Sequence, residues 1–103
     1  MKSIKSWAEE DRPREKMLAK GKEALSNAEL IAILIGSGNS KETAVDLSKR
    51  ILHDNKDNLI ELSRLTINDL MKYNGIGEAK AVSIAAALEL GRRRRFCEAL
   101  EKP

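Results

Sequence analysis

The residues best suited to chemistry lie in one short stretch, residues 74–81, where two glycines precede a run of helix-forming residues. Glycine accepts the positive φ angles of a tight turn without steric cost. The first N–H groups of a helix lack intrahelical acceptors, and the helix dipole adds partial positive charge there. A phosphate can approach such a turn closely where side chains are small. The predicted anion site consists of Gly75, Ile76, Gly77, Ala79 and Lys80.

None of these groups reads a base edge, so this site would contact a nucleic-acid backbone without choosing a sequence. The alternative is that Gly75-Ile76-Gly77 only joins two helices, with Ile76 pointing into the core. The basic Lys80, between two alanines in the first helical turn, favours the binding interpretation. Glu78 opposes it, because a carboxylate repels a phosphate unless it points away or serves the helix N-terminus.

A second basic feature is the arginine run 92–95, which is expected to end the last helix after Gly91. Arg92 and Arg93 are predicted to extend the phosphate-binding surface. The alternative is that basic side chains favour helix C-termini through the dipole and through solubility. Four consecutive residues also spread around a helix, so they cannot all face one ligand. The basic residues between 12 and 16 are interpreted as solvated surface.

Helices must position these motifs, and the pattern of apolar residues predicts an all-α fold. Apolar residues recur three and four positions apart, and strand-forming runs are scarce. The chain has 103 residues, of which 42% are hydrophobic, 34% charged and only 3% aromatic. A compact bundle of about five helices with an aliphatic core is therefore expected. The net charge of +3 is modest, so the location of the charges matters more than their sum.

Capping signals set the expected helix boundaries. The spacing of Ser26 with Glu29, and of Thr66 with Asp69, is that of a capping box. Pro13 fits the first turn of a helix, and Gly21 fits its C-terminal end. Helices are predicted over 12–21, from 26 to 35, over 41–53, around 59–62, from 66 to a turn at 74–77, and from 78 to 94 or beyond.

The two capping boxes belong to an internal repeat. Each copy consists of a helix, a Gly-x-Gly turn (36–38 or 75–77) and a second helix, and such copies would bury their apolar faces against each other. A compact helical domain can also repeat caps and glycines by chance. The second copy, residues 65–94, is predicted to be a helix-hairpin-helix module, which is typical of sequence-independent contact with a nucleic-acid backbone. The turn at 36–38 is interpreted as scaffold, with a second phosphate site as the alternative.

Several other classes are disfavoured. His53 has no cysteine or histidine partners, so no zinc site is predicted. No nucleophile–base pair and no glycine-rich ATP loop occurs, which disfavours a free-standing enzyme. The single Cys97 excludes an internal disulfide, and no signal peptide or membrane span is visible, so a cytoplasmic protein is expected. Trp7 and Tyr73 are interpreted as core or edge residues rather than as platforms for stacked bases.

Four segments together resemble the N-terminal domain of the RadC family, also designated UPF0758. They are residues 12–16 (RPREK), 25–34 (LSNAELIAIL), 75–81 (GIGEAKA) and 89–93 (ELGRR). The resemblance implies a tandem helix-hairpin-helix domain over 12–95, similar to the second domain of RuvA. An irregular lead-in at 1–11 would precede this domain, and the start of a linker at 96–103 would follow it.

Members of this family typically continue into a JAB/MPN-type domain, similar to metal-dependent isopeptidases, whose zinc ligands this chain lacks. The resemblance therefore implies a DNA-binding module of a DNA repair protein, without catalytic residues of its own. The alternative is a protein-interaction or regulatory domain that positions the C-terminal metallohydrolase. Some helix-hairpin-helix modules hold a monovalent cation on hairpin carbonyls, which residues 74–77 could supply; no other cofactor is expected.

Overall fold

The computed structural model describes residues 12–101, which form six α-helices and one short 3-10 helix. Their bounds are α2 Pro13–Lys20, η1 Lys22–Ala24, α3 Asn27–Ile35, α4 Ala44–Asp54, α5 Leu59–Ser63, α6 Ile67–Met71 and α7 Glu78–Glu101. These residues contain no strand, so the all-α prediction is confirmed. The predicted lead-in at 1–11, which includes Trp7, lies outside the described residues.

Both predicted capping boxes are confirmed. The Glu29 N–H donates to Ser26 Oγ at 3.2 Å, and the Ser26 N–H donates to Glu29 Oε1 at 3.0 Å. Thr66 and Asp69 form the same pair of hydrogen bonds, each 3.0 Å long, at the start of α6. The backbone N–H of the capping residue is also the main reason why the carboxyl pKa of Glu29 and of Asp69 is lowered.

The predicted start of α4 at residue 41 is wrong, because an asparagine side chain binds the chain before the helix begins. Asn39 Oδ1 accepts hydrogen bonds from the N–H groups of Lys41, at 2.8 Å, and Glu42, at 2.9 Å. Thr43 then serves as the N-cap and accepts a hydrogen bond from the Asp46 N–H. Local side-chain hydrogen bonds of this kind compete with helix formation, which delays α4 to Ala44.

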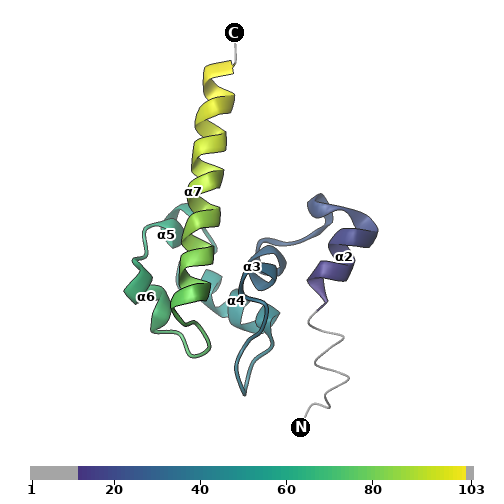
Figure 1. Cartoon of the computed structure of the whole chain (residues 1–103), viewed down its shortest axis with the longest axis vertical. Helices are drawn as coiled ribbons and strands as arrows, with labels where there is room; N and C mark the ends of the chain where they lie inside the picture. The colour runs from purple at the N-terminus through teal and green to yellow at the C-terminus, as the bar shows by residue number, and fades with distance from the viewer. Residues whose placement is uncertain (1–11, 102–103) are drawn as a thin grey trace.

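Helix α6 is shorter than predicted, and α7, predicted to reach residue 94 or beyond, reaches residue 101. Helix α6 ends at Met71, so an irregular stretch at 72–77 separates it from α7. Helix α7 runs to Glu101, which places the arginine run 92–95 inside the helix rather than at its end. In Figure 1 the C-terminal half of α7 extends well beyond the other elements, whereas its N-terminal half packs on the bundle. Residues 96–101, predicted as the start of a linker, continue this helix.

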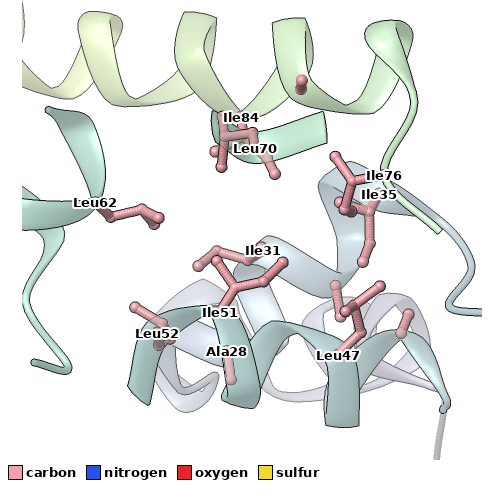
Figure 2. Close-up of a cluster of buried hydrophobic side chains, with 13 residues drawn as sticks. Ala28, Ile31, Ile35, Leu47, Ile51, Leu52, Leu62, Leu70, Ile76 and Ile84 are labelled. Carbon is pink, nitrogen blue, oxygen red and sulfur yellow. The ribbon is translucent and has the colours of Figure 1, made fainter. Parts of the chain in front are cut away.

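The core lies between α3, α4 and α7, with α5 and α6 also packed on α7. Side chains from these helices converge in Figure 2, where Ile84 and Leu70 face Ile31 and Ile51. Three apolar positions correspond between the two copies of the repeat: Ala44, Leu47 and Ile51 match Ala81, Ile84 and Leu88. The first five of these side chains are fully buried, whereas Leu88 is partly buried and packs against the cluster. The two copies of the repeat thus bury their apolar faces in one cluster, as the sequence predicts.

A polar network joins residues 39–42, which precede α4, to α4 and to Tyr73. Glu42 accepts two hydrogen bonds from Arg50, both 2.9 Å, and a third from the Asn39 amide at 3.0 Å. The Arg50 guanidinium lies 5.3 Å from the centre of the Tyr73 ring, and the Tyr73 hydroxyl donates to Asp54 at 2.9 Å. Tyr73 is thus held at the edge of the core, in agreement with its predicted role.

The Arg50 and Asn39 hydrogen bonds lower the carboxyl pKa of Glu42 from 4.5 to about 2. A lowered pKa in the folded state stabilises the protein above pH 4.5, and this stabilisation is lost as the pH falls through about 2. The Glu42→Gln variant should therefore lose less stability than wild type between pH 5 and pH 2. For this partly exposed ion pair the difference should be about 0.5–1 kcal/mol.

Urea unfolding followed by circular dichroism at several pH values measures this difference. Glu23→Gln is the control, because Glu23 is an exposed carboxylate with no ion pair among the described residues. It should keep the pH dependence of the wild type. Identical pH profiles for wild type and Glu42→Gln would show that the Glu42–Arg50 pair does not contribute to stability.

Candidate nucleic-acid interface

The turn between α6 and α7 is built on one glycine with positive φ. Gly75 has φ +98°, a conformation that residues with a side chain rarely adopt. The N–H of Ile76 donates to the Tyr73 carbonyl at 3.0 Å and closes the turn. The Ile76 side chain is only 4% exposed and belongs to the core. It therefore ties the turn to the bundle, and only its backbone can face a ligand.

The N-terminus of α7 is open. The Gly77 carbonyl accepts the first intrahelical hydrogen bond, from the Ala81 N–H at 3.0 Å, which makes Gly77 the N-cap. Glycine has no side chain to accept the next N–H groups. Within residues 12–101, the N–H groups of residues 78–80 donate no hydrogen bond. By contrast, α3, α4, α5 and α6 each begin at a residue whose side chain accepts such a bond.

The glycines of the two turns have different surroundings. A Cβ added to Gly77 would meet no atom within 4 Å, so neither packing nor backbone conformation requires glycine there. A Cβ added to Gly38 would lie 2.1 Å from the Glu42 carbonyl oxygen and 2.6 Å from the Thr43 carbonyl carbon. Gly38 is therefore required by the fold, in line with the predicted scaffold role of the first turn. The open space is at Gly77, next to the free N–H groups.

The two turns contact each other directly. The Asn39 amide donates to the Asn74 carbonyl at 2.8 Å, across 35 residues of sequence. A Cβ on Gly75 would lie 3.0 Å from the Gly38 carbonyl oxygen, so the backbones of the turns are in close approach. Figure 1 shows both turns at the same end of the bundle, at the lower side of the view. We call residues 36–43 the first turn and residues 72–77 the second turn.

Lys80 is part of this turn–turn contact. Its ammonium group donates to the Ser37 carbonyl at 2.8 Å and to Ser37 Oγ at 3.1 Å. An ammonium has three N–H donors, so one remains for a ligand. The positive charge is held beside the open N-terminus of α7, between the two turns. Sequence reasoning placed the charge of Lys80 near this site but missed Ser37 and Asn39 as its neighbours.

The structure does not bring the arginine run to the turns. Arg92 lies fifteen residues after Gly77 on the same helix, which corresponds to about 22 Å. Arg92 makes two hydrogen bonds to Glu89, of 3.0 and 2.9 Å, and Arg93 makes one of 2.9 Å. These contacts lower the Glu89 carboxyl pKa to about 2, first through Arg92 and then through Arg93. The Glu89 carboxylate therefore partly offsets the positive charge that both arginines present to a ligand.

The predicted site residues thus fall into two groups. Gly75, Ile76, Gly77, Ala79 and Lys80 lie together at the second turn and the start of α7. Arg92 and Arg93 form a separate exposed patch on the extended part of α7. The sequence repeat that aligns the two Gly-x-Gly turns was the signal that could have predicted the contact between these turns. It could not indicate that Ser37 would bind Lys80, because that contact depends on how the units pack.

No group of three or more histidine, cysteine or acidic side chains within residues 12–101 could hold a metal ion. None of the helices in this part of the chain is both long enough and apolar enough to cross a membrane.

Residues 12–101 thus form an all-helical domain in which the turn before α4 contacts the turn before α7, beside an open, lysine-flanked helix N-terminus. Residues 4–82 match the family described as UPF0758 N-terminal, and the chain belongs to that family. The family predicted from the sequence is thus confirmed. No solved structure matches the chain.

Full-length relatives are considerably longer than this chain. A UPF0758 protein of Flavobacterium johnsoniae is 63% identical over 93 residues, which cover 90% of this chain and 40% of the relative. A UPF0758 protein of Clostridioides difficile is 48% identical over 90 residues, covering 87% and 38%. One from Trichlorobacter lovleyi is 43% identical over 104 aligned positions, covering 97% and 45%. The chain therefore spans about 40% of the length of the relatives it matches.

Proposed function

We propose that this domain is a non-sequence-specific DNA-binding module of a RadC-like DNA repair protein, with its two hairpins forming a tandem helix-hairpin-helix pair. The observation that carries the proposal is the open N-terminus of α7. Three N–H groups without acceptors, the positive end of a long helix dipole and the Lys80 ammonium lie together beside a glycine with free space around it. That combination suits the close approach of a phosphate.

The binding would not depend on base sequence. Backbone N–H groups and a lysine recognise phosphate oxygens, which every nucleotide carries. Lys41, exposed on the first turn, adds a second positive charge at the same end of the bundle. In this proposal the arginine patch at Arg92 and Arg93 makes a smaller contribution, because Glu89 already binds both side chains.

Fluorescence anisotropy with labelled duplex, single-stranded and branched DNA, each at several salt concentrations, tests the proposal. Affinity should fall steeply as salt rises, because phosphate contacts release condensed counterions. Lys80→Gln should weaken binding to all sequences equally and reduce the slope of log K against log salt by about one. The absence of binding at low salt would refute the proposed function.

Loss of the Lys80 ammonium also removes its two hydrogen bonds to Ser37, so the fold requires a control. Ser37→Ala removes Oγ, one of the two acceptors, while the carbonyl and the lysine charge remain. It should weaken the turn–turn contact but keep the salt slope of the wild type. A slope reduced equally in both variants would mean that Lys80 acts only by joining the turns.

An alternative function is a protein-interaction or regulatory domain that positions a C-terminal JAB-type metallohydrolase. The apolar run 30–35 gives this alternative little support, because Ile31, Ala32 and Ile35 are buried in the core and Leu34 alone is classed as exposed, at 37%. The extended part of α7 favours it more, since Leu90, Phe96 and Leu100 are each more than 60% exposed. A pull-down with the C-terminal part of a relative distinguishes this function from DNA binding. The Phe96→Glu variant, which lacks the exposed aromatic ring, serves as its control.

We infer no catalytic role for residues 12–101 and propose that the domain acts by binding. The exposed Cys97 suits a reducing compartment, and we propose the cytoplasm as the location. A monovalent cation on the carbonyls of 74–77 remains a proposal. Two of these carbonyls already accept hydrogen bonds. The Asn74 carbonyl accepts one from the Asn39 amide, and the Gly77 carbonyl accepts one from the Ala81 N–H.

A further inference from the structure

Helix α7 carries a second apolar face, directed away from the core. Its large exposed hydrophobic side chains are Val82, Leu90, Phe96 and Leu100, which are between 50% and 70% exposed. At about 100° of rotation per residue, these four positions fall within about 120° of the helix circumference. The α7 side chains packed in or against the core, at positions 81, 84 and 88, are centred about 150° away from them. The exposed apolar side chains of α7 are therefore gathered on one face.

This face is continuous along almost the whole helix. Exposed residues follow one another along it in steps of three or four, at positions 79, 82, 86, 90, 93, 97 and 100. Six steps cover 21 residues, so the average step is 3.5 residues, which is the spacing of the contact positions in a coiled coil. We call these seven residues the seam. Its C-terminal part lies where α7 extends beyond the bundle (Figure 1). A seam with this spacing fits a second helix as its partner.

We propose that the seam binds a second copy of this chain, with the two α7 helices antiparallel and centred near Leu90. Full overlap of the two helices, each running from Glu78 to Glu101, sets the register. The contacts are then 79 with 100, 82 with 97, and 86 with 93, while each Leu90 lies next to the Leu90 of the other copy.

The sizes of the seam side chains match in this register. Leu100 meets an alanine at position 79, and Arg93 meets an alanine at position 86. Val82 meets the small side chain of Cys97. Each larger side chain thus faces a smaller one, which allows two helices to pack closely along their whole length.

The charges of α7 also favour the antiparallel orientation. Two parallel helices in register would place both arginine runs, residues 92–95, side by side, and such contact between like charges is unfavourable. In the antiparallel register the runs are about 12 Å apart along the axis, beyond the screening length of about 10 Å at 0.1 M salt. Each Arg93 then lies opposite Ala86 of the other copy, and Glu89 follows on the same helix to accept its guanidinium. Sizes and charges therefore both fit a second, reversed α7.

The inference does not depend on DNA binding. The Lys80 ammonium is bound to Ser37 of the first turn, and Lys80 does not belong to the seam. The experiments that test the seam are carried out without DNA, so their failure would leave the proposed function unaffected.

Sedimentation velocity of the whole chain, from micromolar to millimolar concentration, tests for self-association. The wild type should approach the mass of a dimer as its concentration rises. Leu90→Glu, which brings two carboxylates together at the centre of the helix pair, should weaken association by about tenfold or more. Leu18→Glu is the matched control, because Leu18 is 88% exposed but lies on α2, outside the seam. It should associate like the wild type.

Cysteine cross-linking tests the orientation of the helices. In the antiparallel pair the two Cys97 residues are about 22 Å apart along the axis, too far for a disulfide. Oxidation with copper phenanthroline should therefore leave the wild type without a cross-link. Val82→Cys places a thiol opposite Cys97 of the other copy and should give a disulfide-linked dimer in non-reducing electrophoresis. A wild-type dimer cross-linked through Cys97 would show parallel helices and would overturn the proposal.

Circular dichroism shows whether Leu90→Glu folds, and Leu100→Glu, at a position that is 70% exposed, is a second variant if it does not. A wild type that stays monomeric at millimolar concentration would overturn the proposal. So would a folded Leu90→Glu or Leu100→Glu variant that associates like the wild type. If the wild type is monomeric but binds the C-terminal part of a relative, and Leu90→Glu removes that binding, the seam belongs to that part, which would also overturn the proposal.

Discussion

Gly77→Asp is expected to lower DNA affinity by about 10- to 100-fold at low salt, because charge-assisted hydrogen bonds of the kind lost contribute about 1.5–3 kcal/mol. The new carboxylate would accept the N–H groups of residues 79 and 80 and would repel a phosphate. The same side chain is a favoured N-cap and complements the dipole of α7. Folding stability should therefore stay equal to that of the wild type or rise, so that loss of binding cannot be attributed to unfolding.

Gly91→Asp is the matched control for this prediction. It introduces the same side chain and the same charge into α7, and a Cβ at Gly91 also meets no atom within 4 Å. Residue 91 lies about 21 Å from residue 77 along the helix, beyond the screening length of about 10 Å at 0.1 M salt. Anisotropy at fixed salt should show a change of less than about threefold. Equal losses of affinity in the two variants would point to a general charge effect and would contradict a site at Gly77.

The second large effect is expected from Gly38→Ala, which should destabilise the fold by about 3 kcal/mol or more. The added Cβ would overlap the Glu42 carbonyl oxygen and the Thr43 carbonyl carbon. Both are backbone atoms, at the point where Thr43 caps α4 and Asn39 binds the N–H of Glu42. The overlap can be relieved only by moving the first turn, which also contacts the second turn. Urea unfolding should show a lower midpoint with an unchanged slope.

Gly91→Ala is the matched control, and this substitution of the same kind should raise the folding stability rather than lower it. Gly91 lies in the interior of α7 with free space around its Cα, so alanine there should stabilise the helix by about 0.5–1 kcal/mol. A Gly38→Ala variant with wild-type stability would mean that the first turn is more adaptable than its contacts indicate. It would also remove the physical reason for treating that turn as scaffold.

Signals encoded within a few residues were predictable from the sequence. The two capping boxes depend on a spacing of three residues, and the positive φ of Gly75 follows from the turn it must make. The buried face shared by the two repeats followed from helical periodicity. These features depend on local geometry, so they are visible before the chain is folded.

Features that depend on distant residues were not predictable in the same way. The start of α4 was misplaced because the side chain of Asn39 competes with the helix for the N–H groups of Lys41 and Glu42. The contact between Lys80 and Ser37 spans 43 residues of sequence and exists only once the two hairpins pack. The arginine run suggested a helix end. The helix continues through it because arginine has a high helix propensity, and because ion pairs of Arg92 and Arg93 with Glu89 stabilise this part of α7.

The length of α7 has a consequence for the longer relatives. Its 24 residues correspond to about 36 Å of helix, with the second turn at one end and Glu101 at the other. A group joined to Glu101 would stand at a fixed distance from the second turn and at a fixed rotation around the helix axis. Inserting one residue into the extended part would turn that group by about 100°, whereas seven residues would nearly restore its direction about 10 Å farther away. The length of the helix thus sets both the distance and the rotation of such a group relative to the second turn.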